Sequence, residues 1–112
     1  MRADYYALSA NLAKAYMAFS LAAKASAIEP AIRDLVTIRA SQLNGCAFCL
    51  DMHVKEAKLA GERELRLHHV AIWRESPLFD ARERAALAWT EARTRLGAEG
   101  GSDTAYAAVR AA

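Results

Sequence analysis

The sequence predicts an all-α fold, and two features of its composition support this. Alanine accounts for 27 of the 112 residues, and leucine, arginine and glutamate are also frequent, all of them strong helix formers. Valine, isoleucine and threonine together number 12, which is little material for a β-sheet. A chain of 112 residues has the length of one domain. We therefore expect a single helical domain over residues 1–112, with about six helices.

The first two helices are predicted from apolar periodicity and from a proline. Residues 4–25 repeat apolar side chains at helical spacing, which predicts one long helix with a buried face. The members of that face are Leu8, Leu12, Tyr16, Phe19 and Ala23, and Met17 is expected in the core as well. A second helix begins at Glu29-Pro30, because proline suits the first helical position, and it ends at Asn44-Gly45.

Four more helices are predicted over residues 46–61, 62–73, 80–96 and 102–112. Gly61 is typical of the position just after a helix, and Pro77 interrupts the chain after the fourth. Asp80 is an N-cap with Glu83 three residues later, the pattern of a capping box. Ser102 caps the last helix.

Charge and hydropathy exclude several classes of protein. The 15 basic and 13 acidic residues are interspersed, whereas nucleic-acid modules show a basic cluster. The sequence has no uncharged apolar run of about eighteen residues, the length that spans a membrane. Asp4, Lys14 and Lys24 disagree with a signal peptide around the apolar stretch at 15–23. We therefore expect a cytoplasmic protein with no nucleic-acid and no membrane partner.

The third helix carries the candidate chemistry. Cys46, Cys49 and His53 recur at a spacing that places both thiols and the imidazole on one inward face, together with Leu50, Ala57 and Ala60. His53 lies one turn after Cys49. Both cysteines belong to the first turn, where free backbone N–H groups and the helix dipole favour a thiolate.

Four interpretations of this pattern compete. A dithiol redox site needs a reactive thiolate and a second sulfur within reach, which this spacing supplies. A zinc site needs further ligands, for which only Asp34, His53 and the pair His68-His69 are available. A haem attachment site requires histidine directly after Cys49, where Leu50 stands. The fourth interpretation is a pair of structural cysteines beside a core histidine.

Other notable residues have structural interpretations. Arg39 lies near the middle of the second helix's apolar face, so we expect it to pair with a carboxylate or to reach an interface. The adjacent His68 and His69 point about 100° apart and cannot both face one site. Trp73 and Trp89 are expected in the core or at subunit contacts.

Residues 35–53 read LVTIRASQLNGCAFCLDMH, and this segment resembles the core motif of the AhpD-like alkylhydroperoxidase and carboxymuconolactone decarboxylase superfamily. The similarity continues through Ala57, Gly61, AIWRE at 71–75, Pro77 and RAALAWTE at 84–91, and covers about residues 16–95. The resemblance implies an all-helical AhpD-like fold, peroxide reduction through the cysteine pair, and assembly into trimers or hexamers.

The resemblance also implies residue roles. Cys49 is the peroxidatic thiol, Cys46 the resolving thiol, and His53 works with a carboxylate twelve residues before Cys46. That carboxylate is Asp34 here, where the family has glutamate, so a bridging water would have to link it to His53. Asp34 otherwise lies at the edge of an apolar face, as a solvated surface charge does. The best-studied peroxidases of the family have a histidine just before the second cysteine. This chain has Phe48 there, so it lacks the proton relay that this histidine implies.

From the residues alone, the thioredoxin-like order, with Cys46 as the attacking thiol, stays open. We favour Cys49, because it is the cysteine one turn from the imidazole.

The sequence therefore predicts a cytoplasmic thiol peroxidase or disulfide oxidoreductase with Cys49, Cys46, His53 and Asp34 as site residues and no metal or organic cofactor. Its expected partners are a peroxide, an external dithiol reductant and further copies of itself. The resemblance implies that the family's C-terminal apolar helix is missing after Ala112, which would leave core exposed unless copies cover it. Two rivals remain: a decarboxylase-type lyase acting on a muconolactone, and a non-catalytic helical oligomerisation module.

Overall fold

The structure, a computed structural model, describes residues 3–97 and 101–112, and all regular secondary structure within these ranges is helical. The elements in order are α1 (Tyr5–Leu8), α2 (Ala10–Lys24), α3 (Pro30–Asn44), α4 (Ala47–Leu59), α5 (Glu64–His69), the 3₁₀ segment η1 (Val70–Ile72), α6 (Ala81–Thr94) and α7 (Asp103–Ala111). The predicted all-α class is confirmed, and the second helix has the predicted bounds.

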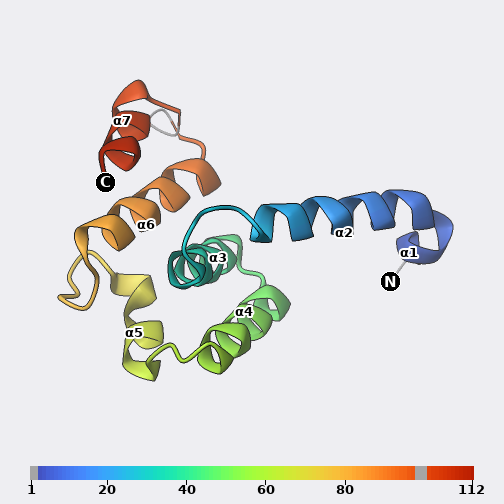
Figure 1. The fold of residues 1–112 in the computed structure, drawn as a ribbon, viewed down its shortest axis with the longest axis horizontal. Coiled ribbons are helices and arrows are strands. Elements are labelled where there is room, and N and C mark those ends of the chain that lie inside the picture. The colour runs from blue at the N-terminus through green and yellow to red at the C-terminus, as the bar shows by residue number, and fades with distance from the viewer. Residues whose placement is uncertain (1–2, 98–100) are drawn as a thin grey trace.

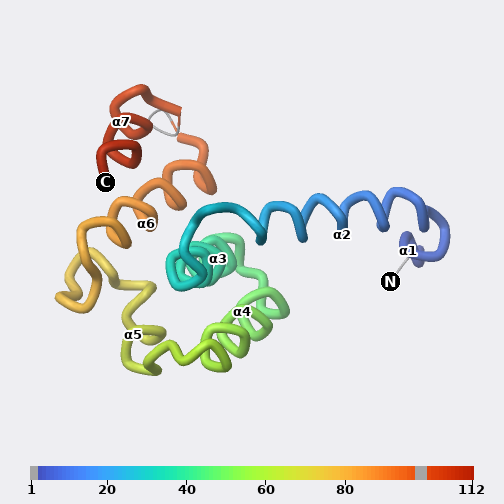
Figure 2. The backbone as a smooth tube through the Cα atoms, in the orientation of Figure 1, coloured from blue at the N-terminus to red at the C-terminus, as the bar shows by residue number. Residues whose placement is uncertain are grey.

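Helix α3 is the centre of the molecule. It packs against α4, α6 and η1, and α7 packs against α6 (Figure 1). The tube in Figure 2 shows the chain passing from α3 through α4 and α5 and then back over α3 as α6. Helix α2 extends away from this group, with α1 folded against its far end.

The core forms where α3 meets α4, α5 and α6. Its fully buried large side chains come from three different segments, with Leu35 and Ile38 on α3, Val70 on η1 and Leu87 on α6. The remaining members of the core cluster are Ala57, Leu67, Trp73 and Phe79. Burying a large apolar side chain contributes about 1.5–3 kcal/mol, and none of the buried side chains comes from α1 or α2.

A polar network joins α3, α6 and the segment after η1. Glu91 on α6 pairs with Arg39 across 2.9 Å, accepts a hydrogen bond from Trp73 at 2.9 Å, and pairs with Arg74. The expected pairing of Arg39 with a carboxylate is confirmed, and so is the placement of Trp73 in the core. Trp89 is half-buried, and its ring lies 5.9 Å from that of Tyr106 of α7 in a tilted arrangement.

The predicted helix over 4–25 is wrong in two respects. Ser9 has φ −135° and ψ 49°, which is not helical, and it divides the segment into α1 and α2. Neither helix contains a buried residue. Leu12 is 73% exposed and Phe19 is 72% exposed. The apolar face exists as predicted, but no other part of the described chain covers most of it, because α2 packs mainly against α1.

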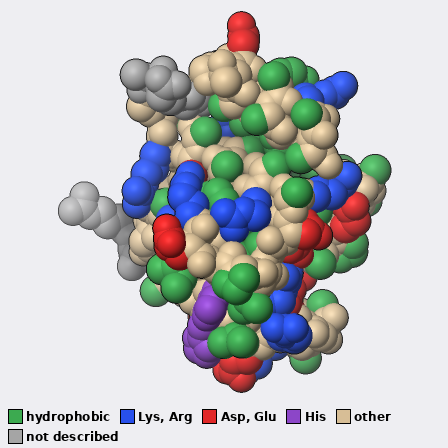
Figure 3. Space-filling view, turned by 90° about the vertical axis from the view of Figure 1, so that its left-hand side faces the viewer, with side chains coloured by type: hydrophobic (Ala, Val, Ile, Leu, Met, Phe, Trp, Pro, Cys, Tyr) green, Lys and Arg blue, Asp and Glu red, His purple; other side chains and the backbone are tan. Residues whose placement is uncertain are grey.

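The other boundaries differ from the predicted ones by a few residues. The capping box at Asp80 and Glu83 is present, with reciprocal hydrogen bonds of 2.8 and 2.9 Å. The fourth helix is shorter than predicted and tightens into η1. Within the described ranges, no helix combines the length and the apolar character needed to cross a membrane. On the face shown in Figure 3, basic side chains lie among acidic and apolar ones.

Candidate active site

The turn between α3 and α4 places the cysteine pair. Gly45 has φ 63° and ψ 28°, the left-handed conformation that ends α3 and that glycine adopts without strain. The next N–H, that of Cys46, donates to the Ser41 carbonyl at 3.0 Å. Cys46 is then the N-cap of α4, and its Sγ accepts a hydrogen bond from the Cys49 N–H at 3.2 Å. Both cysteines therefore lie at the start of α4, as predicted.

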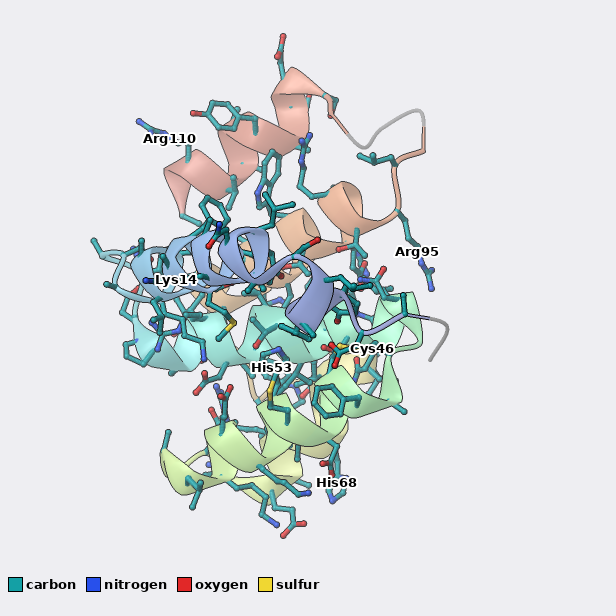
Figure 4. The ribbon with its side chains drawn as sticks, turned by 90° about the vertical axis from the view of Figure 1, so that its right-hand side faces the viewer. Lys14, Cys46, His53, His68, Arg95 and Arg110 are labelled. Atoms are coloured by element: carbon teal, nitrogen blue, oxygen red, sulfur yellow. A yellow bond between two sulfur atoms is a disulfide. The ribbon has the colours of Figure 1, made fainter. Side chains whose placement is uncertain are left out.

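Cys46 and Cys49 are joined by a disulfide, with 5.3 Å between their Cα atoms. Both residues are partly buried. His53 follows Cys49 by one helical turn, and its side chain is 18% exposed. In Figure 4, Cys46 and His53 lie near each other in the middle of the molecule. The structure thus brings three of the four predicted site residues to the first two turns of one helix.

A groove of about 530 Å³ lies between the end of α2, α3 and α4, and we call it the α2–α4 groove. Two of the predicted site residues, Asp34 and His53, line it, together with Lys24 and Glu56. Its apolar lining consists of Phe19, Ala23, Ile28, Pro30, Val36 and Ala60. His53 therefore connects the helix turn that carries the cysteines with an open, largely apolar groove.

Glu56 is a site residue that the sequence interpretation missed. Its Oε2 lies 3.1 Å from Nδ1 of His53, and its Oε1 lies 3.4 Å from Nζ of Lys24. Residues three apart on a helix are neighbours, so the spacing of His53 and Glu56 was the signal available in the sequence. The hydrogen bond with His53 lowers the pKa of Glu56, and Lys24 acts in the same direction against the effect of burial.

Asp34 lies in the groove, but it does not touch the ring directly. Among the described residues, the carboxylate hydrogen-bonded to His53 is Glu56 rather than Asp34. Burial raises the pKa of Asp34, Glu56 adds to this effect by its negative charge, and Arg33 and His53 oppose it. Asp34 is therefore a partly buried carboxylate close to the charges of the site.

The other histidines lie elsewhere. His69 hydrogen-bonds to Oγ of Ser76 at 2.9 Å. His68 is exposed and lies away from Cys46 and His53 (Figure 4). Neither residue lines the α2–α4 groove. In the parts of the chain that the structure describes, no group of three or more His, Cys, Asp or Glu residues is placed to hold a metal ion.

Phe48 stands between the two cysteines and points outward. Its side chain is 78% exposed, and Met52, one turn later on the same helix, is 38% exposed. An apolar surface therefore adjoins the disulfide.

Known proteins that resemble this chain identify its family. The model of the carboxymuconolactone decarboxylase family matches residues 10–92. The uncharacterized protein YdfG of Bacillus subtilis (strain 168) is 37% identical over 109 residues, which is 97% of this chain and 74% of that protein. The uncharacterized protein YnjA of Escherichia coli (strain K12) is 43% identical over 70 residues, which is 62% of this chain and 38% of that protein.

A solved structure is also similar. The crystal structure of ATU0492 from Agrobacterium tumefaciens superimposes with a TM-score of 0.89 at 40% sequence identity, over 98% of this chain and 75% of that chain. ATU0492 is a protein of unknown function that was provisionally described as the antioxidant defence protein AhpD. The family match and the similarity along nearly the whole chain show that this protein belongs to the AhpD-like carboxymuconolactone decarboxylase family.

Proposed function

We propose that this protein is a thiol-dependent peroxidase or disulfide oxidoreductase that reduces peroxides through Cys46 and Cys49 with the help of His53. The observation that carries the proposal is the cysteine pair at the start of α4, with His53 one turn later reaching an open groove. The description of ATU0492 as an antioxidant protein supports the same assignment.

The chemistry requires only the two thiols and one base. His53 takes the proton of the Cys49 thiol, and the thiolate attacks the terminal, hydrogen-bearing oxygen of the peroxide. The O–O bond breaks, Cys49 becomes a sulfenic acid, and the leaving alkoxide takes a proton and departs as an alcohol. The Cys46 thiol then attacks the sulfenic sulfur, which forms the disulfide and releases water. An external dithiol reduces the disulfide and is itself oxidised.

The surroundings of the site fit both partners of this cycle. The α2–α4 groove offers an apolar wall beside His53, which suits the carbon chain of an organic hydroperoxide. The exposed Phe48 stands between the two cysteines of the disulfide and offers an apolar surface to which a reducing partner could bind. Asp34 supports the cycle from the groove by adding negative charge near the imidazole.

Assembly into a homo-oligomer, a trimer or a hexamer, is part of the proposal. The exposed apolar side chains of α1 and α2 need a cover, and monomeric proteins rarely expose large apolar patches. The side chains concerned are Leu8, Leu12, Tyr16, Met17, Phe19 and Leu21. We place the protein in the cytoplasm, where an external dithiol is available to reopen the disulfide.

Mass spectrometry of the reduced protein before and after one equivalent of peroxide tests the function. We expect the mass to fall by about 2 Da as both thiols form the disulfide, and to recover when dithiothreitol is added. A mass that stays unchanged with both thiols still titratable would contradict the proposal.

A variant that lacks both thiols separates the lyase alternative. A decarboxylase-type lyase would not depend on redox thiols, so a Cys46→Ser, Cys49→Ser double variant would keep lyase activity and lose only the reaction with peroxide. In a peroxidase, the double variant loses all turnover.

A further inference from the structure

Glu56 holds the ring of His53 from within the same helix. Its Oε2 lies 3.1 Å from Nδ1 of His53, and the ring is largely buried, with 18% of the side chain exposed. A neutral imidazole carries one N–H, and the nitrogen that faces a carboxylate keeps it. With Nδ1 as the donor, the lone pair lies on Nε2.

A second contact fixes Glu56 in turn. Its other oxygen, Oε1, lies 3.4 Å from Nζ of Lys24, the last residue of α2. Arg33 of α3 donates to the carbonyl oxygen of Lys24, which ties the end of α2 to α3. The two oxygens of Glu56 therefore have separate partners on two different helices.

We propose that Glu56 is a positioning residue, which holds His53 with Nδ1–H toward the carboxylate and leaves Nε2 as the base for the Cys49 thiol. The inference rests on the proposed function and assigns to it a residue outside the Asp34, Cys46, Cys49 and His53 set. The proton that leaves Cys49 goes to Nε2, and the carboxylate of Glu56 stabilises the resulting imidazolium. The same proton then passes to the alkoxide when the O–O bond breaks.

The charges around the ring favour Glu56 over Asp34 in this role. Glu56 makes the direct hydrogen bond, and this bond lowers the pKa of the carboxylate. Burial raises the pKa of Asp34, which has no direct bond to the ring. The other charged side chains that line the groove are Lys24 from α2 and Arg33 from α3, and Glu62 acts on Asp34 by its negative charge.

The test uses Glu56→Gln in a Cys46→Ser background, with the pH profile of iodoacetamide alkylation at Cys49 as the readout. We expect the midpoint of the profile to move to higher pH and the rate near neutral pH to fall by about 3-fold to 10-fold. Asp51→Asn is the matched control, because Asp51 is an exposed carboxylate of α4 whose partner is Lys55. It should leave the profile unchanged.

A second readout does not depend on the thiol. Nitrogen-15 NMR of the ring distinguishes protonated from unprotonated ring nitrogens. In the wild-type protein we expect neutral His53 to carry its proton on Nδ1, and in Glu56→Ala we expect a mixture of tautomers. Alkylation profiles of wild type and Glu56→Gln that superimpose, or a His53 tautomer that ignores Glu56→Ala, would overturn the proposal.

The two proposals fail in different ways. If peroxide does not convert the reduced wild-type protein to the disulfide while the tautomer of His53 still follows Glu56, the peroxidase function is wrong and Glu56 remains the residue that positions the ring. If the disulfide cycle runs at the wild-type rate in Glu56→Gln, the function stands and the role of Glu56 is wrong.

Discussion

Trp73 donates its indole N–H to Glu91 across 2.9 Å, although the two residues are 18 positions apart in the sequence. The indole is nearly inaccessible, at 5% exposure, and the carboxylate side chain is 17% exposed. Burial alone would raise the pKa of Glu91, but hydrogen bonds from Trp73, Arg74 and Arg39 outweigh it and lower that pKa. The fold therefore holds an ionised carboxylate at the junction of α3, α6 and the segment after η1.

Glu91→Gln should lower the free energy of unfolding by about 2–3 kcal/mol, because it leaves Arg39 without its anion in a partly buried setting. Urea denaturation at neutral pH measures this loss. Glu75→Gln is the control, since Glu75 is an exposed carboxylate in the same region of the chain, and it should change stability by less than about 0.5 kcal/mol. Equal effects of the two substitutions would contradict the importance of the Glu91 network.

The same carboxylate makes stability depend on pH. A pKa lowered by folding means that the ionised form stabilises the native state, so the contribution is complete above the ordinary glutamate value of 4.5. It is lost as the pH falls through the lower folded value. We expect wild type to lose stability faster than Glu91→Gln as the pH falls below that ordinary value. Parallel curves of unfolding free energy against pH for the two proteins would count against this.

The order of attack by the two thiols can be decided by trapping. Cys46→Ser should leave Cys49 as a sulfenic acid after peroxide treatment, because no resolving thiol remains, and a dimedone-type probe should label it. Cys49→Ser should leave Cys46 largely unlabelled, since the imidazole is one turn from Cys49. The reverse labelling would establish the thioredoxin-like order.

Asp34→Asn should move stability and reactivity in opposite directions. Because folding raises the pKa of Asp34, its charge is disfavoured in the native state, and this cost is present at neutral pH and disappears as the pH falls through the raised value. Removing the charge should raise the unfolding free energy by about 0.5 kcal/mol or less.

The loss of negative charge near the imidazole should also slow alkylation of Cys49 near neutral pH in the Cys46→Ser background. Asp34→Glu should keep or increase the alkylation rate, because it restores the longer side chain that the family resemblance implies. Superimposed profiles for the three proteins would remove Asp34 from the site and leave the Glu56–His53 pair.

Leu12→Glu should dissociate the oligomer and leave the chain folded. Leu12 is 73% exposed on α2, and α2 has no buried residue. The introduced carboxylate should therefore change the free energy of unfolding of a single chain little, whereas burying it in an apolar interface would be strongly unfavourable. Light scattering and circular dichroism measure the two effects. Lys14→Glu is a control on the same helix, because it changes the charge without removing an apolar side chain. A wild-type protein that is monomeric at micromolar concentration would refute the predicted assembly.

The helices around α3 were predicted well from the sequence, because the residues that begin and end these helices agree with the way the helices pack. Proline at the start of α3, Gly45 at its end and the capping box at Asp80 all appear in the structure as predicted. The apolar face of α2 was predicted to be buried, and it is exposed in the chain taken alone. Apolar periodicity predicts that one face of a helix is buried, but it does not predict whether the same chain or another copy buries it.

The site was predicted in part for a similar reason. The spacing along α4 placed Cys46, Cys49 and His53, since a helix fixes the relation between residues three and four apart. The relation between His53 and the carboxylates depends on how α3 and α4 pack and on which rotamers they allow. The linear motif pointed to Asp34, whereas the ring is hydrogen-bonded to Glu56.

The left-handed turn at Gly45 also sets the tolerance of this region to changes in length. Asp34 lies ten residues before the end of α3, and Glu56 lies nine residues after the start of α4, so the two carboxylates are about equally far from the turn, roughly 14 Å along each helix. One residue inserted or deleted within α3 between Asp34 and Asn44 would rotate Asp34 by about 100° about the helix axis relative to the turn and shift it by about 1.5 Å. The twelve-residue interval between Asp34 and Cys46 therefore sets where Asp34 stands relative to the cysteines, and we expect insertions and deletions to be rare there in functional variants of this chain.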